Sequence, residues 1–154
     1  MTIAVGQMAP DFTMPTNGGG TVSLAGLKGR KVVLYFYPRD DTSGCTTQAC
    51  GFNDALPDFT GADAVVIGVS KDSVASHDKF AQKFGLNFVL ASDEKTDVTE
   101  RYGMWVEKSM YGKKYMGIER STVLIDGEGV IRHIWRKVKP ASHPAEVLAA
   151  VKTL

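Results

Sequence analysis

The stretch YFYPRDDTSGCTTQAC, residues 35–50, decides the fold of this chain because an apolar strand passes into a helix within it. The run KVVLYFY, residues 31–37, is continuously β-branched and aromatic, which is typical of a strand buried on both faces of a sheet. The apolar side chains that follow it recur at helical spacing: Cys45, Ala49, Phe52 and Leu56. This spacing predicts a helix that begins near residues 43–44 and ends near Pro57.

Both cysteines of the chain lie in this stretch, and Cys45 falls in the first turn of the predicted helix. Unpaired backbone N–H groups and the helix dipole favour an anion there, and an ordinary thiol is mostly protonated at neutral pH. The position therefore favours a thiolate at Cys45. A thiolate requires the nearby Asp40 and Asp41 to be solvated, because their charges would otherwise oppose it.

The rest of the chain predicts an α/β protein with a mixed central sheet. Glycine-rich turns at residues 17–20 and 26–29 flank an alternating segment that favours a small N-terminal hairpin. Further strands are predicted at residues 64–69, 88–90, 121–125 and 130–135, and helical segments from Asp72 or Ser73 to Gly85, at 98–102 and behind Pro144. The order βαβ, αβ, ββα is the plan of a thioredoxin-like fold, with helices on both faces of the sheet. We predict one domain over residues 1–154.

Composition excludes several classes of function. Eighteen basic and 17 acidic residues give a net charge of +1 without a basic cluster, which argues against nucleic acid or an anionic membrane as a partner. No stretch approaches the roughly 20 apolar residues of a membrane span, so we expect a cytoplasmic protein. In a reducing cytosol two thiols are not normally kept as a structural disulfide, which indicates a catalytic, redox-active or metal-binding pair.

The motif P-x-x-x-T-x-x-C, formed by Pro38, Thr42 and Cys45, resembles the active-site signature of the peroxiredoxins. The surrounding TSGCTTQAC is similar to the subgroup called bacterioferritin comigratory protein or peroxiredoxin Q. Further matching segments are APDF at residues 9–12, W-x-E-K at 105–108 and GKKYMGIERSTVLID at 112–126. Two positions depart from the pattern. Ser43 replaces a frequent proline, and Gln48 replaces a frequent glutamate, so we assign Gln48 no catalytic role.

The resemblance implies a thiol-dependent peroxidase that reduces hydrogen peroxide and organic hydroperoxides without a cofactor or metal. Cys45 would attack the peroxide and become a sulfenic acid. Thr42 Oγ, the Cys45 N–H and the Arg120 guanidinium would donate hydrogen bonds, and Pro38 would shield the sulfur from water. Arg120 precedes the strand at 121–125, which neighbours the 31–37 strand in this fold. Cys50 would resolve the sulfenic acid as an intramolecular disulfide, which a thioredoxin-like reductant recycles; the subgroup suggests a monomer.

Two other functions fit parts of the sequence. A thioredoxin-like dithiol reductase would use the same fold, but it normally displays C-x-x-C rather than the C-x-x-x-x-C found here. A Cu(I)-binding module would use two thiolates and a histidine. We interpret His77, His133 and His143 as ordinary polar residues, because none has metal-ligand spacing with the cysteines. Packing or apolar surface, rather than a substrate mouth, is the expected role of Trp105, Tyr111, Tyr115 and Met116.

Overall fold

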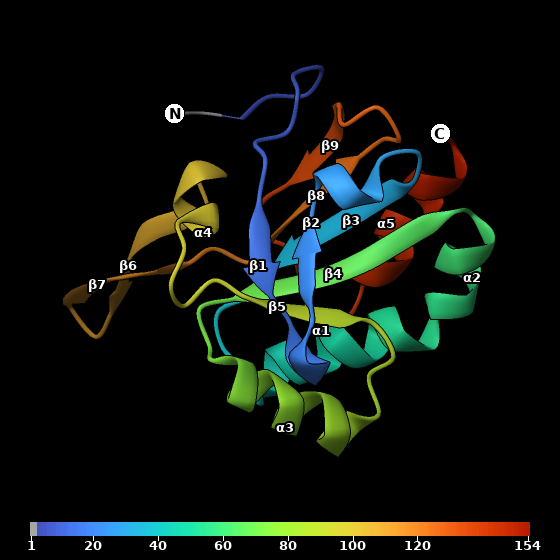
Figure 1. Cartoon of the computed structure of the whole chain (residues 1–154). Coiled ribbons are helices and arrows are strands. Elements are labelled where there is room, and N and C mark those ends of the chain that lie inside the picture. The colour runs from blue at the N-terminus through green and yellow to red at the C-terminus, as the bar shows by residue number, and fades with distance from the viewer. Residues whose placement is uncertain (1–2) are drawn as a thin grey trace.

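A five-stranded sheet in the order β5-β4-β3-β8-β9 forms the centre of the computed structural model, which describes residues 3–154 (Figure 1). β3, β4 and β5 run parallel, whereas β8 is antiparallel to β3 and β9 is antiparallel to β8. The strands span Lys31–Phe36 (β3), Ala64–Ser70 (β4), Val89–Ser92 (β5), Ser121–Ile125 (β8) and Ile131–Trp135 (β9). The mixed thioredoxin-like sheet expected from the sequence is confirmed.

Helices cover the two faces of this sheet unequally. The helices span Ser43–Asp54 (α1), Leu56–Gly61 (α2), Val74–Phe84 (α3), Val98–Arg101 (α4) and His143–Lys152 (α5). Side chains of α1, α2, α3 and α5 share one apolar cluster with Val33, Tyr35 and Tyr37 of the β3 segment. The other face, with Val32, Leu34 and Phe36, is covered by the short α4 and by the N-terminal segment. That segment holds the predicted hairpin, Thr13–Pro15 (β1) and Thr21–Ser23 (β2), with 3-10 turns at Asn17–Gly19 and Ala25–Leu27.

The helix signals located α3 closely and misplaced the end of α1. Ser73 caps α3 by accepting a hydrogen bond from the Ser76 N–H at 3.1 Å, and Gly85 ends it with a left-handed φ of 62°. The helix predicted to end near Pro57 is in fact two helices, because α1 ends at Asp54 and Pro57 lies in the first turn of α2. A proline in the first turn costs no hydrogen bond, so it begins a helix here instead of ending one.

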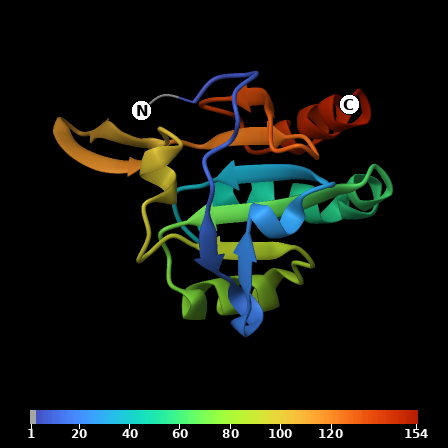
Figure 2. The ribbon, with the colours of Figure 1, turned by 45° about the horizontal axis from the view of Figure 1, so that its top comes forward.

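A second two-stranded hairpin, Trp105–Met110 (β6) and Lys113–Ile118 (β7), was not predicted as strands. It projects from the body of the molecule in Figure 2 and forms its own sheet. Side chains on both faces of β7 are exposed, so the sequence shows no alternation between apolar and polar residues. The available signal was the turn, where Tyr111 and Gly112 both have positive φ, 52° and 79°. None of the helices within residues 3–154 is long and apolar enough to cross a membrane.

Candidate active site

Cys45 lies in the first turn of α1 and is only 1% exposed, in the apolar cluster that also holds Tyr35 and Phe52. The first backbone hydrogen bond of the helix runs from the Thr46 N–H to the Thr42 carbonyl at 2.8 Å. The N–H groups of the residues before Thr46, including that of Cys45, have no carbonyl acceptor within the helix. The Thr42 side chain does not cap them, and its hydroxyl donates to the Arg39 carbonyl at 3.2 Å. This leaves an uncapped helix end, which favours negative charge on or beside the sulfur.

Strand pairing brings Arg120 to Cys45 across 75 residues of sequence. Ser121, the first residue of β8, pairs with Phe36, the last residue of β3. Arg120 therefore lies where β3 passes into the loop before α1, and its Nη2 donates to Cys45 Sγ at 3.2 Å. A Cβ on Gly44 would lie only 3.2 Å from the same Nη2, so the glycine leaves room for the guanidinium.

Gln48 holds Arg120 in this position, which sequence reasoning missed. Arg120 Nη1 donates to Gln48 Oε1 at 2.6 Å, and the Gln48 side chain is fully buried one helical turn after Cys45. Its Nε2 has no hydrogen-bond partner among residues 3–154. A polar residue three positions after Cys45, on the inner face of a helix, was the available signal. Gln48 touches the arginine rather than the sulfur, so it is a positioning residue.

For the thiol-dependent peroxidase that the resemblance implies, we expect Gln48→Ala to slow the reaction with peroxide by about tenfold or more, because the charged Nη1 loses its buried acceptor. Gln48→Glu should recover most of the rate, since a carboxylate oxygen also accepts from the guanidinium. Thr47→Ala, an exposed change in the same helix, should react like the parent protein. Stopped-flow measurement of thiol loss against peroxide concentration tests this; equal rates in the alanine variant and the parent would remove Gln48 from the site.

The two aspartates before the helix differ from the expectation that both are solvated. Asp41 is exposed and forms an ion pair with Lys83 at 2.8 Å. Asp40 is buried, and its carboxylate accepts hydrogen bonds from Tyr37 at 2.5 Å and from Ser76 at 2.8 Å. Asp40 can be buried against α3 because these two donors replace the water molecules that its carboxylate loses.

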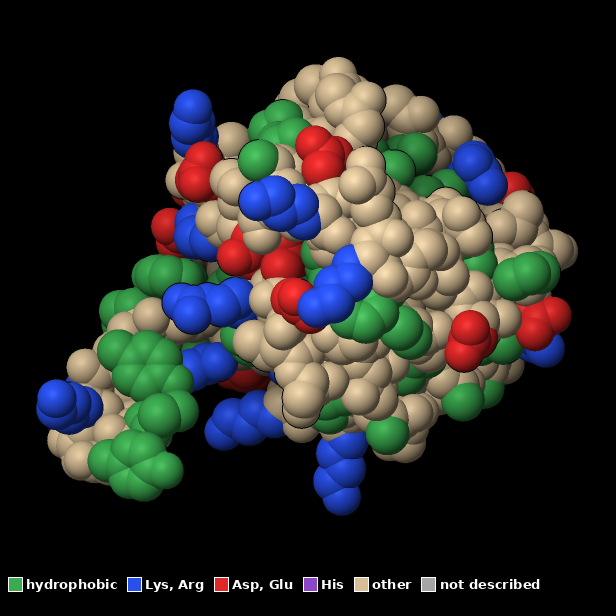
Figure 3. Space-filling view, turned by 90° about the horizontal axis from the view of Figure 1, so that it is seen from below, with side chains coloured by type: hydrophobic (Ala, Val, Ile, Leu, Met, Phe, Trp, Pro, Cys, Tyr) green, Lys and Arg blue, Asp and Glu red, His purple; other side chains and the backbone are tan. Residues whose placement is uncertain are grey.

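A groove of about 600 Å³ opens between the Pro38–Thr42 loop and the β6–β7 hairpin. Pro38 and Thr42 line one side, and Trp105, Tyr115 and Met116 line the other. These three residues thus border the candidate site, contrary to the expectation, whereas Tyr111 is 99% exposed at the hairpin turn. Figure 3 shows apolar and basic side chains together on the projecting hairpin. The groove offers an open, partly apolar approach beside the loop that precedes Cys45.

Ionisable side chains around the site have shifted pKa values. Lys108 lines the groove, where partial burial and then the nearby Arg120 charge lower its pKa. Partial burial raises the pKa of the Cys50 thiol, and the Asp54 carboxylate one turn later raises it further. Cys50 is therefore a protonated thiol at neutral pH and has no cation comparable to Arg120 within bonding distance among the described residues.

Two of the histidines are buried, which the sequence interpretation missed. His143 packs behind α1 against Phe52, and its Nε2 lies 2.7 Å from Thr122 Oγ1; burial lowers its pKa. Within residues 3–154, the only cluster with the spacing of metal ligands is Asp40, Asp72 and His77, whose ligand atoms lie within 4.8 Å of one another. It includes neither cysteine, so the soft ligand set of a Cu(I) module is not assembled.

Comparison with known proteins shows the family to which the chain belongs. Residues 5–134 match the family model described as AhpC/TSA family. The chain belongs to the AhpC/TSA family. The putative peroxiredoxin bcp of Coxiella burnetii is 56% identical over 96% of this chain and 98% of its own length. Peroxiredoxin Bcp of Bacillus subtilis is 49% identical over 100% of this chain and 98% of its own.

Solved structures of similar proteins share the fold of this chain. A structure of Xanthomonas campestris bacterioferritin comigratory protein superposes with a TM-score of 0.88, at 45% identity over 92% of this chain and 90% of that one. A mutant of Xylella fastidiosa PrxQ superposes with a TM-score of 0.93, at 37% identity over 98% and 96%. The enzyme is thus a peroxiredoxin of the Bcp or peroxiredoxin Q type, a thiol-dependent peroxidase with a peroxide substrate and a thioredoxin-type reductant. The dithiol reductase and the copper module are not favoured.

Proposed function

We propose that Cys45 is the cysteine that reduces the peroxide, for both hydrogen peroxide and organic hydroperoxides. The observation that carries this assignment is the 3.2 Å contact between Arg120 Nη2 and Cys45 Sγ at an uncapped helix end. The thiolate attacks one peroxide oxygen, an S–O bond forms and the O–O bond breaks. The departing oxygen takes up a proton and leaves as water or an alcohol, and the sulfur becomes a sulfenic acid.

The groups around Cys45 form hydrogen bonds with the two peroxide oxygens, on which negative charge develops as the O–O bond breaks. Arg120 and the Cys45 N–H donate to the peroxide, and they are already in place before it arrives, which favours the transition state. Thr42 was expected to donate to the peroxide, but its hydroxyl hydrogen is bonded to the Arg39 carbonyl. Its oxygen accepts from the peroxide O–H instead. Pro38, at the edge of the groove, limits the access of water from that side.

Cys50 then resolves the sulfenic acid. Its sulfur attacks the Cys45 sulfur, water leaves and an intramolecular disulfide forms, which a dithiol reductant of thioredoxin type reduces back to two thiols. Both cysteines lie in α1, and five residues along an ideal helix separate the Cα atoms by about 8.7 Å. A disulfide needs about 4.4–6.8 Å, so part of α1 must unfold first.

The contacts of α1 indicate which part unfolds. Thr46 and Thr47 are poor helix formers near its uncapped start. Gly51 has a packing role besides its low helix propensity, because a Cβ there would lie 2.9 Å from Pro144 Cγ of α5. The α1–α5 contact at Gly51 therefore resists unfolding, and we propose that the helix melts from Ser43 towards this contact.

For Cys50→Ser we expect one normal oxidation of Cys45 followed by a stalled cycle, because the sulfenic acid has no partner thiol. Stoichiometric peroxide should consume one thiol in this variant and two in the parent, where hydrogen exchange becomes faster across residues 44–54. A disulfide between chains, or a free Cys50 in oxidised parent protein with an unchanged helix, would exclude the intramolecular mechanism.

A monomer and a cytoplasmic location remain part of the proposal. An intramolecular disulfide needs no second chain, and recycling by a dithiol reductant requires a reducing compartment. Light scattering of the reduced and oxidised protein tests the first point, and fractionation of cells tests the second.

A further inference from the structure

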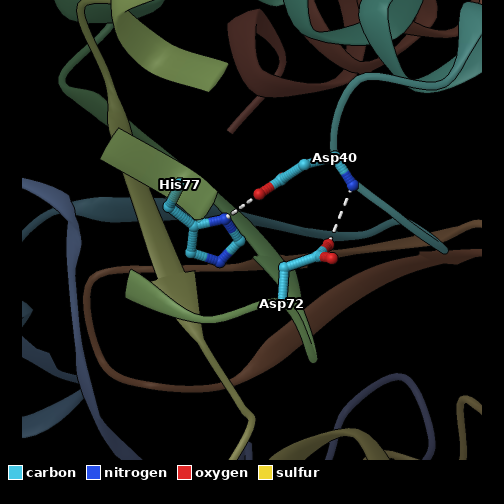
Figure 4. Close-up of side chains that lie close together, drawn as sticks. All are labelled: Asp40, Asp72 and His77. Carbon is cyan, nitrogen blue, oxygen red and sulfur yellow. Dashed lines mark hydrogen bonds and ion pairs between the residues drawn. The ribbon is translucent and has the colours of Figure 1, made fainter. Parts of the chain in front are cut away.

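Asp40 is a buried carboxylate within the loop that carries Pro38 and Thr42. Both of those residues are exposed, whereas the Asp40 side chain is 4% exposed. The Asp40 N–H also donates to Asp72 Oδ2 at 2.8 Å (Figure 4). Asp41 follows with a left-handed φ of 59°. The loop is thus fastened to the protein body through Asp40, at its centre.

The third partner of Asp40 is His77 of α3, which is completely buried. His77 Nε2 lies 3.0 Å from the Ala91 carbonyl oxygen of β5, which can only accept, so Nε2 carries a hydrogen. His77 Nδ1 lies 2.7 Å from Asp40 Oδ2 (Figure 4). A neutral ring with its hydrogen on Nε2 would direct a lone pair at a carboxylate oxygen. A second proton must therefore lie between His77 and Asp40.

The groups around the pair favour placing that proton on the imidazole. The Tyr37 hydroxyl, at the end of β3, donates to Asp40 Oδ1 and lies 3.4 Å from His77 Nδ1. Burial raises the pKa of Tyr37, which keeps this phenol a neutral donor. Ser76 of α3 also donates to Asp40, and after β4 the Asp72 carboxylate adds a second negative charge within 4.8 Å. Two hydrogen-bond donors besides His77 keep the Asp40 carboxylate charged, and a second carboxylate lies nearby, so both features favour the proton on the imidazole.

We propose that Asp40 and a protonated His77 form a positioning pair that fixes the Pro38–Thr42 loop for peroxide reduction. The inference rests on the proposed role of that loop beside Cys45. Removing the proton would place a carboxylate against a lone pair in a buried site and would break one of the bonds that hold the loop to α3, leaving the bond from Ser76. A misplacement of about 1 Å at a reacting centre can cost about 100-fold in rate. Alkaline pH should therefore slow the peroxide step, although thiolate formation by itself accelerates it.

The protonation state is tested directly by nitrogen NMR of histidine-labelled protein. We expect His77 to show hydrogens on both ring nitrogens at pH 7, one bonded to the Ala91 carbonyl and the other to Asp40. A His77 ring with an unprotonated Nδ1 at pH 7 would overturn the proposal, whatever the behaviour of the variants.

The positioning role is tested by the peroxide rate of His77 variants against pH. His77→Leu removes the donor to Asp40 and should lower the rate at pH 7 by about 10- to 100-fold. His77→Asn keeps a neutral donor near the Nδ1 position, so it should retain more of the rate and lose the alkaline decline of the parent. His133→Asn is the control and should keep both the rate and the profile.

The outcomes separate this inference from the proposed function. If both His77 variants lose rate equally and keep the parent pH profile, His77 has only a structural role and the inference is wrong. If Cys45→Ser remained active, the proposed function itself would fail. An inactive Cys45→Ser together with unaffected His77 variants would reject the positioning pair alone.

Discussion

Replacing Cys45 by serine is expected to abolish peroxide reduction, with a loss of more than about 1,000-fold in the rate of peroxide consumption. A serine hydroxyl is a far weaker nucleophile than a thiolate, and the Arg120 guanidinium that contacts the sulfur cannot ionise a hydroxyl at neutral pH. A serine side chain cannot form a sulfenic acid, so the disulfide with Cys50 cannot form either.

The measurement is single-turnover loss of hydroperoxide in metal-free protein, compared with the number of thiols lost. Cys50→Ser serves as the matched control, because it removes the other thiol from the same helix and should still consume one equivalent of peroxide. Turnover by Cys45→Ser at a rate near that of the parent would show that the chemistry lies elsewhere in the chain.

Arg120→Ala should slow the attack on peroxide by about 100- to 1,000-fold, since one preorganised donor to a transition state contributes roughly 3 to 4 kcal/mol. The substitution removes the donor to Cys45 Sγ and also the partner of Gln48 Oε1. Gln48 would then be a buried amide with neither end bonded, which adds a cost in stability of about 1–3 kcal/mol.

Arg120→Lys is the informative comparison for this prediction. A lysine keeps the charge but cannot donate to the sulfur and to Gln48 from one rigid plane, so it should recover only part of the rate. Stopped-flow rates, measured where thermal unfolding shows each variant to be folded, separate chemistry from stability. Rates within about twofold of the parent for Arg120→Ala would remove the arginine from the reaction.

The peroxiredoxin signature and the buried strands could both be recognised in the sequence, for different reasons. The run at residues 31–37 and the spacing from Cys45 to Phe52 follow from local geometry, because burial on both sides and a period of 3.6 residues each leave a pattern in the chain. The role of Arg120 came only from the resemblance, because an isolated arginine carries no such pattern. The β6–β7 hairpin left no alternation, since both faces of β7 are exposed.

The sequence by itself determined the elements of the sheet, the position of Cys45 at a helix start and the peroxiredoxin assignment, because these depend on residues close together in the chain. Only the tertiary structure decided how the site is held together. The pairing of β3 with β8 brings Arg120 to the sulfur, the inner face of α1 turns Gln48 towards that arginine, and α3 buries Asp40 against His77. Each of these contacts joins elements whose approach is set by packing across the sheet, and no local pattern records which side chain will meet which.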